Sequence, residues 1–343
     1  MTLSPITSPH TQGNNRTQRV MLLVALACVP GFAVLSYFYG LGPLSNLILA
    51  ISFALILETS VVKLRQRPVS FYLKDASALV TAILLALALP PYAPWWLVFI
   101  AVFFAMIFGK HLYGGLGQNP FNPAMLGYVV VLISFPVDMT SWLTPETSIT
   151  LGLQSVLGNT LPDGWSQATA LDLLKTNQKL TLDELYTNHP LSFGSLGGAP
   201  SQWVNLGFLL GGLFLLYKRV ISWHAPIAML LSLSLMSLIF WNGTGSESHG
   251  SPLFHLFTGA TMLGAFFIIT DPVSGATSVK GRLIFGAGVG VITYVIRALG
   301  GYPDGMAFAV LLLNLCAPTI DYFTKPRSYG HKKAVRGFKT GDH

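Results

Sequence analysis

The chain has 343 residues, of which 52% are hydrophobic and only 10% are charged. Soluble domains carry roughly one quarter charged residues, and the apolar residues here gather into runs long enough to cross a hydrocarbon layer of about 30 Å. This composition excludes a soluble globular protein. The net charge of +7 does not indicate nucleic-acid binding, because the positive charges lie in short loops between apolar runs and in the C-terminal tail.

About ten apolar runs are predicted to form transmembrane helices, which makes the chain an all-α polytopic membrane protein. The first run, near Val20, is as long as a span and lacks a small-residue cleavage site, so we expect it to be retained. The expected spans cover residues 20–39, 43–62, 76–90, 94–109, 123–136, 203–217, 222–241, 254–270, 283–299 and 305–323.

The distribution of lysine and arginine predicts the orientation. With an even number of spans and a cytoplasmic N-terminus, the 20 basic residues all fall on the inner side except Lys175, Lys179 and Arg297. The positive-inside rule predicts such an asymmetry for only one orientation. We therefore expect a multi-pass protein of the bacterial inner membrane with both termini in the cytoplasm.

One connection, residues 137–202, is much longer than the others, and this orientation places it outside the cytoplasm. Long loops usually carry function, and this one is acidic. The chain is thus predicted to consist of an N-terminal membrane half (1–136), an extracytoplasmic loop (137–202), a C-terminal membrane half (203–323) and a basic cytoplasmic tail (324–343).

Two Gly-Gly segments indicate an internal repeat. Residues 113–120 (YGGLGQNP) lead into the fifth span, and residues 299–305 (LGGYPDG) lead into the tenth. Segments five spans apart begin on opposite sides of the membrane, as in an inverted repeat. Gly-Gly followed by Pro breaks a helix, and broken backbone at membrane depth must be buried in protein or line a cavity. We expect two inverted five-helix repeats with broken helices, although two ordinary interfacial turns would share the same few residues.

Three segments have the form Ser/Thr-x-Ala-Thr. They are Ser166–Thr169 in the outer loop, Thr258–Thr261 in the eighth span and Ser274–Thr277 in an inner loop. The chain offers no Gly-rich dinucleotide fingerprint after a strand. Its two cysteines, Cys28 and Cys316, lie in separate apolar runs, where we expect small buried residues and not a disulfide or an iron–sulfur site.

Around these motifs the chain resembles the NqrB/RnfD family. It looks like the RnfD component of the Rnf (Rsx) ion-translocating electron transport complex and, more distantly, like the NqrB component of the sodium-pumping NADH:quinone reductase. The resemblance covers nearly the whole chain, and its most specific stretches are residues 110–123, 163–171, 258–272 and 300–308.

The resemblance implies a covalent flavin. In families that use it, the motif marks the threonine to which a flavin transferase joins FMN through a phosphoester outside the cytoplasm. The family's flavinylated segment corresponds to residues 163–171, which implies that Thr169 carries the FMN, with Ser166 in the recognition pattern and Asp163 in a preceding turn. Gln167 departs from the commoner glycine, which the other two motifs keep.

Location separates the three threonines. A transferase outside the membrane needs a reachable hydroxyl, and only Thr169 lies in a polar outer loop. Thr261 lies in an apolar span, where we expect its hydroxyl to bond a carbonyl one turn earlier or to pack against a neighbouring helix. The small residues around Thr261 could admit a second, noncovalent flavin. Thr277 faces the cytoplasm.

Ionisable residues within spans are functional candidates by default. Glu58 lies near the end of the second span, where either an interfacial ion pair with Lys63 or Arg65 or a role in an ion pathway is expected. Arg297 precedes the second Gly-Gly segment, where it either pairs with Asp304 or neutralises an anionic cofactor group.

Four other polar residues are predicted to have structural roles. Asp271 and Asp321, at inner span ends, are expected to be anchors. His111 and His224 have no metal-ligand spacing and are expected at the membrane interface, so we predict no metal site.

The resemblance implies a flavin-carrying component, not catalytic alone, of a six-subunit complex that couples nicotinamide- or ferredoxin-linked electron transfer to translocation of Na+ or H+. The other components of the complex, a flavin transferase and membrane lipid would be its partners. The alternative is a secondary transporter or channel without a redox cofactor, because carriers are often built from inverted repeats with broken helices. The long outer loop with its motif favours the redox function, since a simple carrier needs neither.

Overall fold

The computed structural model describes residues 17–144, 149–158, 166–177, 180–243, 245, 248–326 and 329–330. Within these ranges the chain is mostly helical, with one short pair of antiparallel strands. Five helices are long and apolar enough to cross a bilayer: Thr17–Tyr39, Gly42–Leu64, Ala199–Tyr217, Val279–Leu299 and Met306–Thr324. Shorter apolar helices lie beside them, so the structure supports a multi-pass membrane protein.

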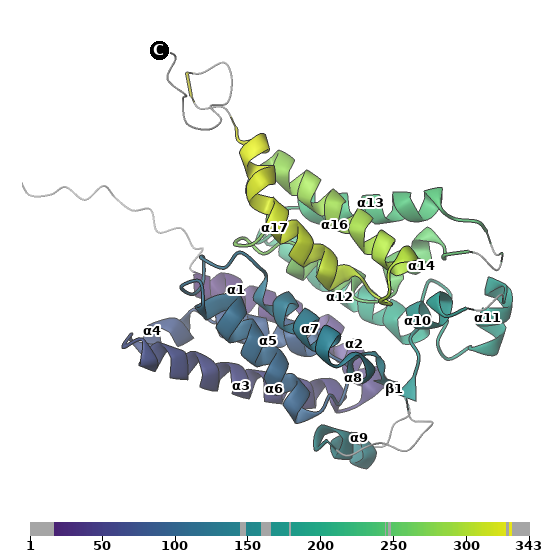
Figure 1. The fold of residues 1–343 in the computed structure, drawn as a ribbon, viewed down its shortest axis with the longest axis horizontal. Helices are drawn as coiled ribbons and strands as arrows, with labels where there is room; N and C mark the ends of the chain where they lie inside the picture. The colour runs from purple at the N-terminus through teal and green to yellow at the C-terminus, as the bar shows by residue number, and fades with distance from the viewer. Residues whose placement is uncertain are drawn as a thin grey trace, which may run out of the picture.

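The N-terminal half forms one group of helices, coloured purple to blue in Figure 1. The first rod has a small irregularity at Cys28, which divides it into two helices. Proline occupies the first turn of α2, α3 and α7, where its missing N–H costs no hydrogen bond. The elements are α1 (Thr17–Ala27), α2 (Val29–Tyr39), α3 (Gly42–Leu64), α4 (Val69–Lys74), α5 (Ser77–Ala88), α6 (Trp95–Phe103), the π-helix η1 (Phe104–His111) and α7 (Pro123–Ser134).

The C-terminal half, green to yellow in Figure 1, packs beside the first. It contains α12 (Ala199–Tyr217), α13 (His224–Ile239), α14 (Pro252–Phe257), α15 (Thr261–Leu263), the π-helix η2 (Gly264–Ile268), α16 (Val279–Leu299) and α17 (Met306–Thr324).

Between the halves in sequence lies the predicted loop, which gathers at one end of the helices (Figure 1). Its small apolar core includes Leu171, Leu185 and Phe193 and packs against Phe254 of α14. The loop is therefore a folded module docked on the C-terminal half. Its elements are α8 (Pro136–Thr140), β1 (Trp142–Leu143), α9 (Ile149–Val156), β2 (Ser166–Gln167), α10 (Ala170–Lys175) and α11 (Leu182–Asn188).

The predicted spans and the helices agree in position, with one correction. The run 254–270 is not a single helix, because the chain leaves helical geometry between α14 and α15. Gly259 has a φ of +59° there, a left-handed conformation that glycine adopts at little cost. The buried Asn205 of α12 bridges this break: its Nδ2 donates to the Gly259 carbonyl and its Oδ1 accepts from the Met262 amide, both at 2.9 Å.

Glycines let the helices approach closely at two places. Gly207 and Gly211, four residues apart on α12, leave so little room that an added Cβ would meet the backbone of Gly31 and of Ala27. On α16, Gly286 likewise approaches the backbone of α13. Small residues at such spacing drive helix packing in membranes, where the hydrophobic effect does not.

The main apolar core runs through both halves and includes Leu85, Ala101, Phe266 and Val289. Large apolar side chains also cover the outside of the helices, such as Leu210, which is 62% exposed. A water-soluble protein rarely exposes apolar patches of this extent, so these faces are suited to lipid.

Candidate functional site

Thr169 lies where the outer module meets the membrane halves. The two-residue strand β2 pairs with β1, with Trp142 opposite Gln167, and this fixes the chain just before Thr169. The Gln167 side chain adds a hydrogen bond of 2.5 Å to the Ser192 hydroxyl. The chain then turns directly into α10, for which Thr169 is the N-cap.

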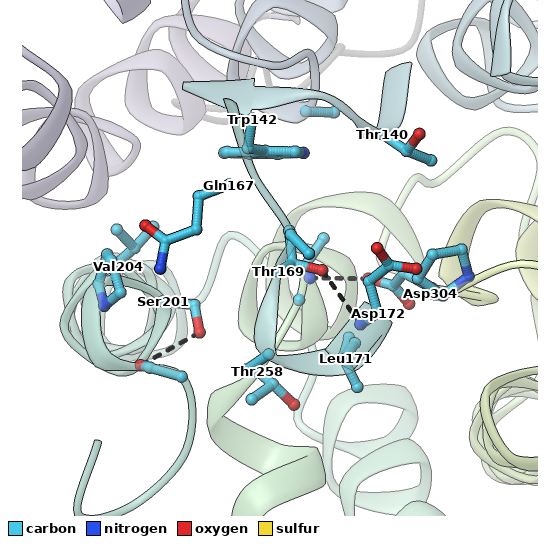
Figure 2. A pocket seen from close by; sticks show the side chains of 18 of the residues that line it. Thr140, Trp142, Gln167, Thr169, Leu171, Asp172, Ser201, Val204, Thr258 and Asp304 are labelled. Atoms are coloured by element: carbon cyan, nitrogen blue, oxygen red, sulfur yellow. Dashed lines mark hydrogen bonds between the residues drawn. The ribbon is translucent and has the colours of Figure 1, made fainter. Parts of the chain in front are cut away.

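The Thr169 hydroxyl is half-buried and lies at the wall of a cavity. Its Oγ1 accepts a hydrogen bond of 3.3 Å from the Asp172 amide (Figure 2), as an N-cap side chain does. In that bond the oxygen is the acceptor, so the hydroxyl hydrogen is not consumed. An oxygen that has formed an ester keeps lone pairs, and modification at this atom is compatible with the cap.

The cavity opens between the outer module and both membrane halves, with a volume of about 180 Å³. That is room for on the order of ten water molecules, enough for a flat ring system. Its lining is mostly apolar and aromatic with a few polar groups, as is typical of cofactor sites. Residues from all three regions contribute, among them Tyr39, Tyr128, Trp142, Thr169, Phe208, Thr258 and Asp304. Figure 2 shows Thr169 near the centre of these residues.

The expected ion pair between Arg297 and Asp304 is present behind the cavity wall. Arg297 is 4% exposed, and its Nη2 and Nε lie 3.0 and 3.1 Å from Asp304 Oδ1. Asp304 Oδ2 accepts from the Ala260 amide at 2.9 Å (Figure 2), so the pair also closes the break after α14. The guanidinium additionally donates to the His255 carbonyl at 2.8 Å. Because its donors are used within the protein, this arrangement supports the structural role for Arg297 over neutralisation of a cofactor.

Thr261 belongs to the same buried network. Its hydroxyl donates toward the carbonyls of Thr258 and His255, at 2.8 and 2.9 Å, and accepts from Arg297 Nη2 at 2.9 Å. The expected bond to a carbonyl about one turn earlier is therefore found. Thr261 is fully buried and has no free hydroxyl to offer a flavin.

Lys175, at the end of α10, connects the outer module to the second Gly-Gly segment. Its ammonium donates to the carbonyls of Tyr302 and Ile296 at 2.5 and 3.2 Å. Partial burial lowers the pKa of Lys175, as desolvation of a cation does. Thr169 and the Arg297–Asp304 pair are thus held in one rigid neighbourhood. From the sequence, Lys175 was expected only as an outer charge.

The remaining residues of the three motifs lie apart from this site or outside the described residues. Asp163 lies outside them, and Ser166 is described only as backbone in β2. The Thr277 amide donates to Asp321 at 2.9 Å near the start of α16. Asp321 is thereby an anchor, as expected, and so is Asp271, which accepts from the Ser274 hydroxyl at 2.7 Å.

The predicted partners of Glu58 are wrong. Glu58 is fully buried and bonds Lys110 Nζ at 2.8 Å and His111 Nε2 at 2.7 Å, instead of Lys63 or Arg65. Lys110 and His111 are therefore buried groups and not an inner-loop charge and an interfacial histidine. No sequence pattern indicates this cluster, because its members are more than 50 residues apart and meet only in the folded bundle.

The local cause is the π-helix η1, in which Lys110 and His111 are the last two residues. A π-helix is wider than an α-helix and often marks a functional site. Lys110 also donates to Ser77 Oγ at 2.9 Å, and Ser77 in turn donates to Asp75 at 2.6 Å. A chain of hydrogen bonds therefore leads from the buried Glu58 to the start of α5.

A second cavity, of about 130 Å³, lies beside this cluster. It is lined by Lys110 and Ser77 from the N-terminal half and by Phe266 and Asp271 from the C-terminal half. Asn119 also lines it, and among the described residues its Oδ1 has no hydrogen-bond partner. Buried acceptors are rarely left unpaired, so this cavity has the character of a binding site.

Two smaller expectations divide. His224 begins α13 and stacks on the exposed Trp223, which fits an interfacial residue. Cys28 is buried as expected, but Cys316 is exposed on α17. It lies beside the exposed Leu315, so this correction follows from a helix face that the protein itself does not cover.

Fold and site together define the class: a multi-pass helical membrane protein with a cavity between its two halves, capped by a folded module that presents a threonine hydroxyl. The chain belongs to the NQR2, RnfD, RnfE family, whose model matches residues 5–330. The resemblance stated from the sequence is thereby confirmed.

Curated relatives agree along the full length, and each of them is the D component of an ion-translocating oxidoreductase complex. The chain is 66% identical to that of Pseudomonas aeruginosa (strain LESB58), with 100% of both chains covered. It is 67% identical to that of Ectopseudomonas mendocina (strain ymp), again over 100% of both. The identity is 50% with that of Yersinia pseudotuberculosis (strain IP 31758), covering 95% of this chain and 97% of the relative.

Proposed function

We propose that the chain is the flavin-carrying membrane component of a complex that couples electron transfer to translocation of Na+ or H+. The names of its relatives support a component of an ion-translocating oxidoreductase. The observation that carries the flavin assignment is Thr169, whose hydroxyl borders an aromatic-lined cavity beneath a folded outer module. The nicotinamide- or ferredoxin-linked donor, the other members of a six-subunit complex and a flavin transferase are its proposed partners.

The residues present fit a covalent FMN. Thr169 would hold the phosphate through its Oγ1, and the flavin would supply one- or two-electron transfer. Trp142 and Tyr128 offer flat faces against which a ring system packs. The Arg297–Asp304 pair keeps the broken backbone at residues 258–260 in place, so the inner wall of the cavity is rigid. The protein thus positions the ring, and its apolar walls exclude water from it.

A second, noncovalent flavin is better accommodated by the second cavity than at Thr261. The Thr261 hydroxyl is engaged by two carbonyls and by Arg297, whereas Asn119 in the second cavity has an acceptor without a partner among the described residues. The two cavities border opposite parts of the molecule, one beside the outer module and one beside η1, and each is lined by both halves.

The proposed membrane arrangement is ten spans in two inverted repeats, in the inner membrane with both termini in the cytoplasm. Helix packing supports the repeat: α3 packs on α6 as α13 packs on α16, while α2 meets α12 and α7 meets α17 across the halves. Each half also buries one cation just before its Gly-Gly segment, Lys110 in the first and Arg297 in the second.

The test is covalent flavin content. The chain, co-expressed with a flavin transferase, is run on a denaturing gel under ultraviolet light, and its intact mass is measured. We expect a fluorescent band with the mass of one added FMN residue, and loss of both in Thr169→Ala. Thr277→Ala, which alters another Ser/Thr-x-Ala-Thr motif, is the matched control and should keep the flavin.

A dark wild-type band, with an active transferase shown on another substrate, would refute the covalent flavin and favour the solute carrier. Fluorescence that persists in Thr169→Ala and disappears in Thr277→Ala would move the attachment site to the other motif.

A further inference from the structure

Four exposed cations surround the end of α3 and the short helix α4, at the end of the bundle opposite the outer module (Figure 1). We call them the basic rim: Lys63, Arg65, Arg67 and Lys74. Between residues 59 and 76 the one carboxylate is Asp75, which accepts hydrogen bonds from the amide and hydroxyl of Ser77 at 2.8 and 2.6 Å. Its charge is thus directed to the start of α5, and the rim is strongly positive.

The basic rim lies at the level of lipid headgroups. Helix α3 has 23 residues, which gives a length of about 34 Å, slightly more than a hydrocarbon core of about 30 Å. Its last turn therefore emerges at the bilayer surface, and α4 follows after only four residues. Cations in this zone are attracted to anionic lipid by about 1 kcal/mol each.

Apolar side chains stand between these cations. Leu64 is 83% exposed and Phe71 is 70% exposed. Nearby, Arg65 donates to the His111 carbonyl at 2.6 Å, which brings the exposed Leu112 close to the same surface. A surface of alternating cations and large apolar side chains fits the boundary between headgroups and acyl chains.

Arg67 is held in a fixed position within the rim. Its Nη1 donates to the Tyr72 hydroxyl at 2.7 Å, and the guanidinium lies 5.9 Å from the Tyr72 ring centre. The other guanidinium donors stay available, and an arginine fixed in this way loses little conformational freedom when it binds a phosphate.

From this geometry we infer that the basic rim and α4 form a binding site for an anionic phospholipid. The rim binds the headgroup phosphate, while Leu64 and Phe71 contact the acyl chains. Charge complementarity and the position of α4 at the end of a membrane-length helix carry this assignment, which is independent of the proposed flavin.

The test measures lipid binding to the purified full-length chain. Phosphatidylglycerol and phosphatidylcholine with the same acyl chains are titrated in detergent, and bound lipid is counted by native mass spectrometry. We expect tighter binding of phosphatidylglycerol, and an approximately 25-fold loss in Arg67→Gln/Lys74→Gln, about fivefold for each charge. Arg67→Lys/Lys74→Arg should keep the preference. Arg65 is left intact because it also bonds the His111 carbonyl.

The matched control, Lys218→Gln/Lys280→Gln, removes two exposed charges from loops of the other half and should change the affinity less than twofold. Equal binding of both lipids by the wild type would overturn the inference, as would an equal loss in the control. Binding of soluble glycerol phosphate as tight as that of the lipid would show a simple phosphate site and also overturn it. Thermal unfolding in phosphatidylcholine checks that the variants are folded.

Discussion

At the scale of single residues, the charges inside this protein divide by how far apart their partners lie in the chain. Arg297 and Asp304 are seven residues apart across one turn, and the sequence could predict their pairing. Glu58 and Lys110 are 52 residues apart, and only the packing of α3 against η1 brings them together. Local pairings follow from the sequence, whereas long-range pairings depend on a tertiary fold that no spacing reveals.

The Glu58 cluster makes a prediction about stability. Glu58→Gln leaves the Lys110 ammonium buried without its counter-charge, which typically costs about 3–5 kcal/mol. We expect a clearly lower Tm in scanning fluorimetry of the detergent-solubilised protein. Glu58→Gln/Lys110→Met, which removes both charges, should recover part of the loss.

Asp183→Asn is the control for this pair, since Asp183 is an exposed carboxylate in α11 and its Tm should match the wild type. If Glu58→Gln unfolded at the wild-type temperature, the buried ion pair would not exist in solution.

At the scale of helices, the sequence predicts position better than shape. Long apolar runs reproduce the membrane helices to within a few residues, because hydropathy and length are local properties. The break after α14 was missed, since it requires Asn205 from another helix to satisfy the freed backbone groups. The candidate site follows the same division: Thr169 came from a motif, but Tyr128, Trp142 and Lys175 were found only in the structure.

The glycine contact between α12 and α1 makes a prediction of opposite sign to helix propensity. Replacing a helical glycine by alanine at an open site stabilises by about 1 kcal/mol. At Gly211 the new methyl group would overlap the Ala27 carbonyl, and such overpacking costs about 1–3 kcal/mol. We expect Gly211→Ala to lower the Tm.

Gly301→Ala is the matched control, because an added Cβ there meets nothing within 4 Å, and its Tm should stay unchanged. A rise in the Tm of Gly211→Ala would mean that α12 and α1 are not in close contact in the membrane.

At the scale of the whole molecule, the outer module and α4 lie at opposite ends of the bundle (Figure 1). If the helices cross a bilayer, residues of these two elements must face opposite compartments. The flavin assignment depends on this, because the transferase reaches only one side.

Cysteine labelling in intact cells tests the arrangement. Asn188→Cys in α11 and Ser70→Cys in α4, both at exposed positions, are introduced with Cys316→Ser, while Cys28 is buried. A membrane-impermeant maleimide should label position 188 in whole cells, and position 70 only after the membrane is opened. Labelling of both, or of neither, in whole cells would contradict the orientation.

The extra width of η1 also affects how the two halves can be compared. Lys110, in this π-helix, precedes Gly114 by four residues, whereas Arg297, in the regular helix α16, precedes Gly300 by three. A π-helix accommodates one residue more than an α-helix over the same rise. An alignment of the halves that matches both the cations and the glycines therefore needs a gap of one position, and an ungapped comparison places the two segments out of register.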